Sequence, residues 1–176
     1  MALFNARFTK QGSLLDFSYR VLIHVCMNIN FWAVLVSALA SMVIGSVWYG
    51  PLFGKKFMVA MGMDKWSPEK QAAMKKTMGM SFVLQFVASL AMFIGLALML
   101  ALGRTIVEFA SFSGAEPDFV GWRVGLTSGF FIWLSFVVPV KLGDAIWGGS
   151  WTLFWLGIGN MFVTLLAAGA IIGAWR

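Results

Sequence analysis

The sequence has 176 residues, of which 60% are hydrophobic and 11% are charged, and its mean hydropathy is +0.85. This apolar fraction exceeds what a water-soluble domain of this length can bury, so a soluble globular protein is excluded. The net charge of +6 comes from 13 basic and 7 acidic residues. Because the basic residues lie between apolar runs, the charge indicates membrane orientation, and no nucleic-acid partner is expected.

Residues 1–26 differ from the rest because charged residues alternate with scattered apolar ones. A signal peptide would also place basic residues before an apolar run. This run continues to Tyr49, however, so cleavage within it would divide a hydrophobic helix, and we favour a retained helix. We interpret 1–26 as an N-terminal extension, either an interfacial amphipathic segment or a stretch upstream of a true start at Met27. A single membrane domain is expected over 27–176.

The first transmembrane helix is predicted over about 30–49. Gly50 and Pro51 are expected to end it, because proline lacks the backbone donor and clashes with the preceding turn. Small residues recur every four positions along this helix and would let another helix approach closely. This predicted packing stripe consists of Ala33, Ser37, Ser41 and Gly45.

The connection over 52–77 carries six lysines against two acidic residues. Within it, Ser67, Pro68 and Glu69 form a helix start, with a capping hydroxyl, a proline at the first position and an acid in the first turn. The helix is predicted to run on into the second span, at about 78–102. A short loop outside the membrane is expected over 105–119.

The third span is predicted over about 119–138, with Pro139 ending or kinking it. A short link over 141–150 would lead to the fourth span, at about 151–174. Three glycines at four-residue spacing give the third span a second close-packing face. These glycines are Gly121, Gly125 and Gly129.

The predicted fold class is therefore all-α, an integral membrane bundle of four transmembrane helices. Both halves follow the order helix, proline, turn with glycine and lysine, helix, so two tandem helical hairpins are an alternative description. Seven lysines lie at one end of this bundle against three arginines at the other, or against six basic residues if 1–26 is included. The positive-inside rule then predicts a cytoplasmic-membrane protein with 52–77 in the cytoplasm and both termini outside.

The centres of the predicted helices contain no ionisable residue, which argues against a proton-coupled pump. Gln85 and Asn160 are informative because an amide facing hydrocarbon is costly unless it is hydrogen-bonded. Together with Thr127 they would line a path for a small solute. The alternative, which we favour, is that they form hydrogen bonds between helices.

The residues that catalysis needs are scarce in this sequence. His24 is the only histidine and has no acid nearby, and Asp144 is a single carboxylate beside Lys141. Methionines around the first connection would suit Cu(I), but no Cys or His accompanies them, so gap filling is favoured. We expect no enzyme, no catalytic residue, no cofactor and no metal site.

Two segments carry a family resemblance. Residues 48–55 read Trp-Tyr-Gly-Pro-Leu-Phe-Gly-Lys, and residues 170–175 read Ala-Ile-Ile-Gly-Ala-Trp. They resemble the helix ends of DUF1761, a bacterial family of four-helix membrane proteins with a Trp-Tyr-Ser-Pro-Leu turn and a basic first connection. Gly50 stands where the family usually has serine. The resemblance covers about Met27 to Trp175 and implies the four-helix topology, but no catalytic residue, because the family has no established activity.

We therefore expect a non-enzymatic accessory or interaction subunit of a membrane assembly. Its expected partners are the lipid bilayer and either further copies of the chain or other membrane subunits. The alternative is a small-solute carrier or channel subunit with a polar path through Gln85, Thr127 and Asn160. The segment at the end of the first span is the candidate interaction turn. Its residues are Trp48, Tyr49, Pro51, Phe53, Gly54 and Lys55.

Overall fold

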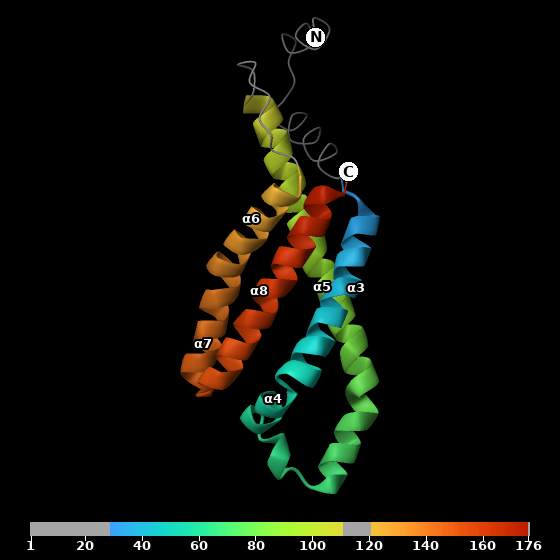
Figure 1. The fold of residues 1–176 in the computed structure, drawn as a ribbon, viewed down its shortest axis with the longest axis vertical. Helices are drawn as coiled ribbons and strands as arrows, with labels where there is room; N and C mark the ends of the chain where they lie inside the picture. Colours follow the sequence, from blue (N-terminus) through green and yellow to red (C-terminus); the bar gives the residue numbers. More distant parts are fainter. Residues whose placement is uncertain (1–28, 111–120, 176) are drawn as a thin grey trace, which may run out of the picture.

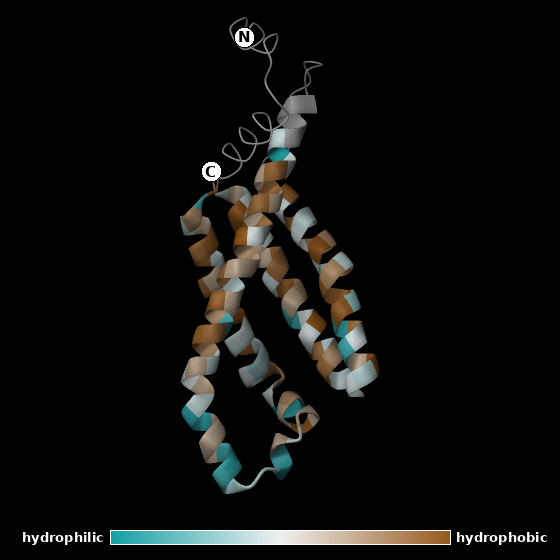
Figure 2. Ribbon diagram, turned by 180° about the vertical axis from the view of Figure 1, so that it is seen from behind, coloured by the Kyte–Doolittle hydropathy of each residue, from teal (hydrophilic) through white to brown (hydrophobic). Residues whose placement is uncertain are grey.

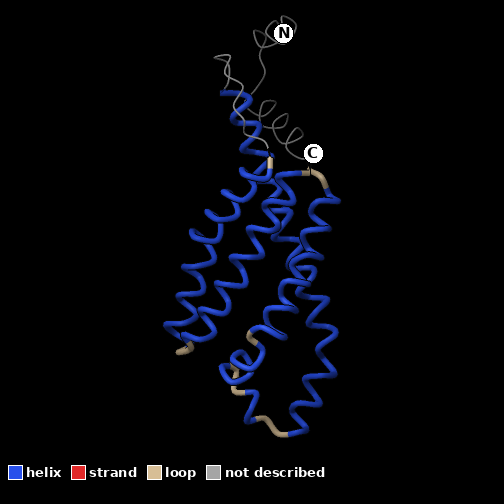
Figure 3. Tube along the Cα trace, in the orientation of Figure 1, coloured by secondary structure: helices blue, strands red, loops and turns tan. Residues whose placement is uncertain are grey.

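The computed structural model describes residues 29–110 and 121–175, which form helices joined by short turns (Figure 3). No strand occurs within these ranges, and the predicted all-α class is confirmed. Two of the elements, η1 and η3, are π-helical turns, and η2 is a short 3₁₀ helix. In chain order the elements are α3 (Phe31–Val47), η1 (Trp48–Leu52), α4 (Gly54–Ala60), η2 (Met63–Lys65), α5 (Pro68–Ala110), α6 (Trp122–Ile132), η3 (Trp133–Val137), α7 (Val138–Gly148) and α8 (Trp151–Ala174).

Four helical segments are long and apolar enough to cross a membrane, which is the organisation of a multi-pass membrane protein. They alternate in direction, so the start of α3 and the end of α8 lie at the same end of the bundle (Figure 1). The second segment has 38 residues. At 1.5 Å per residue it is about 57 Å long, well beyond a hydrocarbon core of about 30 Å. Its hydrophilic start projects past the neighbouring helices (Figure 2).

Three helix starts have capping side chains, of which the sequence analysis predicted the one at Ser67. The side-chain oxygen of Asn30 accepts hydrogen bonds from the backbone N–H groups two and three residues later, at 3.0 and 3.3 Å. Ser67 and Ser150 each accept one from the N–H three residues later, at 3.3 and 3.4 Å. These bonds satisfy donors that a helix cannot satisfy itself. The predicted helix start at Ser67-Pro68 and the predicted bounds 151–174 are confirmed.

The helix of the first span extends beyond its predicted end at Tyr49. Residues 48–52 form a π turn with Pro51 inside it. The N–H of Phe53 donates to the carbonyl of Trp48, five residues back, at 2.9 Å. The wider π turn accommodates the proline ring, which would clash with the carbonyl four residues back in an α-helix. The chain then bends at Phe53 and continues as α4.

The predicted link over 141–150 is wrong. The third span continues through η3 and α7 to Gly148, and only Gly149 and Ser150 connect it to α8. Pro139 does not end the helix, because it lies in the first turn of α7 directly after a π turn, where its missing donor is tolerated. Gly149 has a φ of 71°, a left-handed conformation that favours glycine at a helix end.

The predicted loop over 105–119 is also wrong in its first part, because α5 continues to Ala110. No proline or glycine occurs between Thr105 and Ala110, so nothing local breaks the helix. The rest of that loop, the first residues of the predicted third span and the extension 1–26 lie outside the described residues.

The centre of the bundle is α8, which contacts α3, α4, α6 and α7. A smaller apolar cluster joins α7 to α8 through Ala145, Phe154 and Ile158. The main buried cluster joins α3, α5 and α8, and only the middle of the long α5 takes part in it. Its members are Ala33, Val34, Ala38, Phe93, Leu96, Ala97, Leu100, Leu165, Ala168 and Ile172.

Candidate functional site

The glycine stripe of the third span packs inside the chain. A Cβ on Gly125 would collide with the backbone carbonyl of Gly169, and one on Gly129 with that of Leu165. A Cβ on Gly173 would lie 2.7 Å from the carbonyl oxygen of Gly121. The backbones of α6 and α8 are therefore in direct contact. Gly125 and Gly129 permit this close approach, whereas Gly121 precedes α6 and a Cβ on it would meet no atom within 4 Å.

The stripe on α3 is also used internally. Ser37 and Ser41 are buried, and their hydroxyls donate to carbonyls of α3 at 2.8 and 2.7 Å. A Cβ on Gly45 would lie 4.0 Å from the side-chain nitrogen of Asn160 on α8. Together with the buried Ala33, these three residues position α3 within the bundle.

The candidate interaction turn is mostly an internal clamp. The indole N–H of Trp48 donates to the carbonyl of Leu156 on α8 at 3.1 Å, and its ring packs 4.8 Å from that of Phe53. A Cβ on the buried Gly54 would lie 2.9 Å from the carbonyl oxygen of Tyr49. The other two predicted residues, Pro51 and Lys55, are exposed. Of the six residues of the turn, only these two are exposed enough to contact a partner over their whole side chains.

A second tryptophan uses the same device, and sequence reasoning missed it. Trp133 begins η3 as Trp48 begins η1, and its indole N–H donates to the carbonyl of Ile158 at 2.8 Å. The first and third spans therefore each bond to a backbone carbonyl of α8, and these two carbonyls are two residues apart. The available signal was a tryptophan shortly before each intramembrane proline. This parallel agrees with the shared order of the two halves of the chain.

The three polar residues of the predicted solute path do not meet. Gln85 is exposed on α5, and Thr127 is exposed on α6, where its hydroxyl donates to the Arg123 carbonyl at 2.8 Å. Asn160 is buried on α8 and accepts a hydrogen bond from the Thr164 hydroxyl at 3.1 Å. No common polar lining connects them within one chain.

Two lysines near the helix ends have local partners. Lys141 and Asp144 make an ion pair of 2.9 Å on α7, as their i, i+3 spacing suggested. The ammonium of Lys70 lies 4.4 Å from the ring centre of Trp66. Within residues 29–110 and 121–175, no group of three or more His, Cys, Asp and Glu side chains is placed to hold a metal ion.

Comparison with known proteins supplies a family. The sequence profile of DUF1761, described as a protein of unknown function, matches residues 32–173. The chain belongs to the DUF1761 family. Searches of curated proteins and of solved structures returned no match to it. Because the family is of unknown function, we infer the function from the surfaces of this chain.

One face of α5 in this DUF1761 protein has a seven-residue repeat that the bundle leaves largely open, although Met92 packs against the main buried cluster. Its members are alternately four and three residues apart, which places them in one stripe along the helix. Most of them are exposed, Met99 to 63%, and a Cβ on Gly95 would meet no atom within 4 Å. We call this stripe the α5 seam. It consists of Ser81, Gln85, Ala88, Met92, Gly95 and Met99.

The exposed amide of the α5 seam lies within the second membrane-spanning segment. Phe82 of α5 lines the same groove as Met42 and Tyr49 of the antiparallel first span. Gln85 is three residues further along, about 4.5 Å closer to the start of α3. That depth corresponds to Met42, which stands at the middle of the 22-residue span Phe31–Leu52. Sequence reasoning singled out Gln85 but missed the repeat around it.

Proposed function

We propose that this DUF1761 protein is a non-enzymatic subunit of a membrane assembly and that it binds another transmembrane helix along the α5 seam. The observation that carries the proposal is the exposed side chain of Gln85 within the apolar second span. An amide without a hydrogen-bond partner in hydrocarbon costs about 4 kcal/mol or more. A second helix on the seam would supply that partner.

The residue sizes along the α5 seam support close helix packing. Ser81, Ala88 and Gly95 are small and recur every seven residues, while larger side chains alternate with them. A repeat of 3.5 residues keeps such a stripe facing a neighbour in a left-handed pair. Small residues let the two backbones approach. A single polar layer, here Gln85, fixes the register of such a pair.

A second copy of the chain is the partner that these features fit most directly. Two copies share one orientation in the membrane, so a two-fold axis along the membrane normal makes their α5 helices parallel. Each seam residue then faces its own counterpart. Glutamine both donates and accepts, so Gln85 can pair with Gln85 of the second copy.

Disulfide trapping tests this proposal. In a Cys26→Ser background, Ala88→Cys should form a disulfide-linked dimer in the native membrane under mild oxidation. Val87→Cys is the matched control, because it is adjacent, exposed to 55% and about 100° away around the helix. Equal cross-linking at both positions, or none at Ala88, would contradict a specific seam. If Ala88→Cys, but not Val87→Cys, forms a cross-link to a different protein, the α5 seam is still an interaction surface. Its partner is then that protein instead of a second copy of the chain.

Substitution of the amide tests the same surface without cysteines. Gln85→Leu should weaken dimerisation about three- to thirty-fold, the range expected for a hydrogen bond between transmembrane helices. Its circular dichroism and thermal unfolding should stay unchanged, because Gln85 is outside the buried cluster. A variant that dimerises like the parent would exclude Gln85 from the contact.

We further propose that residues 52–77 face the cytoplasm of a bacterial cell and that both termini lie outside. The arrangement of the helices supports this orientation. The six lysines of that connection, together with Lys141, occupy the end of the bundle opposite to the start of α3 and the end of α8 (Figures 1 and 2). Short basic connections remain on the cytoplasmic side during insertion.

A further inference from the structure

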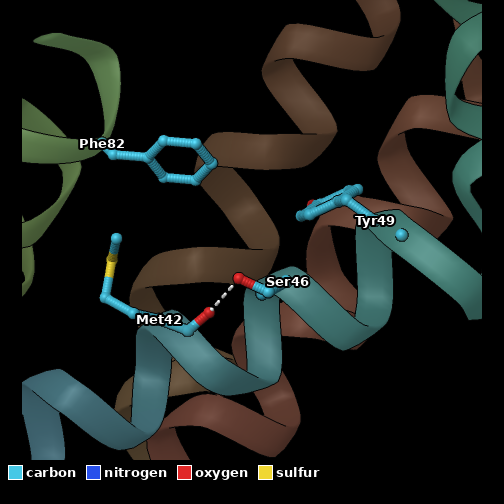
Figure 4. Close-up of a pocket in the computed structure, with 6 residues that line it drawn as sticks. Met42, Ser46, Tyr49 and Phe82 are labelled. Carbon is cyan, nitrogen blue, oxygen red and sulfur yellow. Dashed lines mark hydrogen bonds between the residues drawn. The ribbon is translucent and has the colours of Figure 1, made fainter. Parts of the chain in front are cut away.

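A groove of about 350 Å³ opens between the first span and α5, where these helices diverge toward the lysine-rich end (Figure 1). In Figure 4 the ring of Phe82 from α5 and the ring of Tyr49 from η1 point into the space between the helices. This volume is at the lower end of the range for small-ligand sites. The lining residues are Met42, Gly45, Ser46, Tyr49, Gly50 and Phe82.

The chemistry of the groove suits a hydrocarbon chain. Both walls belong to membrane-spanning segments, so the groove opens toward lipid rather than water. The hydroxyl of Ser46 donates to the Met42 carbonyl at 2.8 Å, as Figure 4 shows, so it does not require a polar ligand. The remaining lining comes mainly from apolar side chains and glycine.

A positive charge lies on the same face of α5, toward the end of the bundle. Lys75 precedes Phe82 by seven residues, two helical turns, so it lies about 10 Å below it on the same face. On the other wall, the chain leaves η1 and enters α4, which begins with the exposed Lys55 and Lys56. Phe57 of α4 packs 4.8 Å from the ring of Tyr49, which holds α4 against the groove.

We infer that the groove holds one acyl chain of an anionic phospholipid, whose headgroup phosphate contacts Lys75 and the start of α4. Six lysines against two acidic residues over 52–77 give this end of the protein a charge complementary to such a headgroup. The site is independent of the α5 seam. Ser81 of the seam and Phe82 of the groove are consecutive, so the two surfaces lie about 100° apart around α5.

Native mass spectrometry of the full chain, released from detergent with added lipid, tests the headgroup. The probes are phosphatidylglycerol and phosphatidylcholine with identical acyl chains. We expect about five-fold stronger retention of phosphatidylglycerol, and loss of most of that preference in Lys75→Gln. Lys76→Gln is the matched control, because it removes the same charge from the next position, about 100° away. Equal retention of the two lipids, or an equal effect of the two substitutions, would overturn the inference.

A second pair of variants tests the acyl chain. Ser46→Leu places a larger side chain in the groove and should reduce retention of both lipids at least three-fold. Thr127→Leu is the control, because Thr127 is also exposed and bonded to a carbonyl four residues back, but on α6. Circular dichroism and gel filtration verify that each variant folds. Unchanged lipid retention in Ser46→Leu would refute the site. Loss of the dimer instead of loss of lipid would also refute it, because a second copy of the chain would then occupy the groove.

Discussion

The contact between α6 and α8 predicts that a single methyl group at Gly125 destabilises the fold. A Cβ there would lie 2.5 Å from the carbonyl carbon of Gly169 and 3.2 Å from the Cα of Gly173. Both are backbone atoms, which cannot rotate away as a flexible side chain would. The carbonyl oxygen of Gly169 is nearer still, so restoring an ordinary contact of 3.4 Å requires the two helices to separate by more than about 1 Å.

The loss of stability depends on the contacts between α6 and α8 that this separation weakens. A gap of about 1 Å forfeits roughly a quarter to a half of the dispersion energy of each contact across it. The neighbouring Leu165 and Ala168 are almost fully buried, and overpacking of such a site costs about 1–3 kcal/mol. Alanine returns about 0.5–1 kcal/mol of helix propensity. The difference between these two contributions is about 1 kcal/mol, and we expect Gly125→Ala to lower the free energy of unfolding by that amount.

The assay is reversible unfolding in mixed micelles, followed by circular dichroism. Gly143→Ala on α7 is the matched control, because a Cβ there would meet no atom within 4 Å, and it should be neutral or slightly stabilising. Agreement of the two variants within about 0.5 kcal/mol would refute direct backbone contact between α6 and α8. If Gly125→Ala loses the dimer but keeps its stability, Gly125 instead lies at an interface between chains.

Three further predictions concern the π turns and the orientation. Trp133→Phe removes the indole donor to the Ile158 carbonyl and should lower the free energy of unfolding by about 1 kcal/mol, whereas Trp122→Phe, at an exposed position, should change it little. Gly54→Ala places a methyl 2.9 Å from the Tyr49 carbonyl oxygen and should cost about 1–2 kcal/mol; a thermal midpoint equal to that of the parent would contradict the packed turn. The orientation can be tested with a reporter enzyme that is active only outside the cytoplasm. Fused to the C-terminus, this enzyme should be active, and an inactive but correctly inserted fusion would show that the C-terminus faces the cytoplasm.

The sequence by itself determined the features that depend on local chemistry. Apolar run length relative to bilayer thickness is enough to place four spans. Capping side chains act on donors two or three residues away, so the helix start at Ser67 was predicted, and the caps at Asn30 and Ser150 follow the same local rule. The bounds of α8 followed from the length of its apolar run. The stripes of small residues were also visible, as was the polar character of Gln85 and Asn160.

Tertiary structure decided how these features are used. A proline ends a helix only if the surrounding packing does not stabilise a π turn, and both π turns here place a tryptophan against a carbonyl of α8. A glycine stripe does not reveal whether its neighbour is in the same chain, and here Gly125 meets Gly169. The same holds for the two amides, since α8 is central and buries Asn160, while α5 diverges from the bundle and exposes Gln85. These outcomes depend on contacts between residues far apart in the chain, which local patterns do not encode.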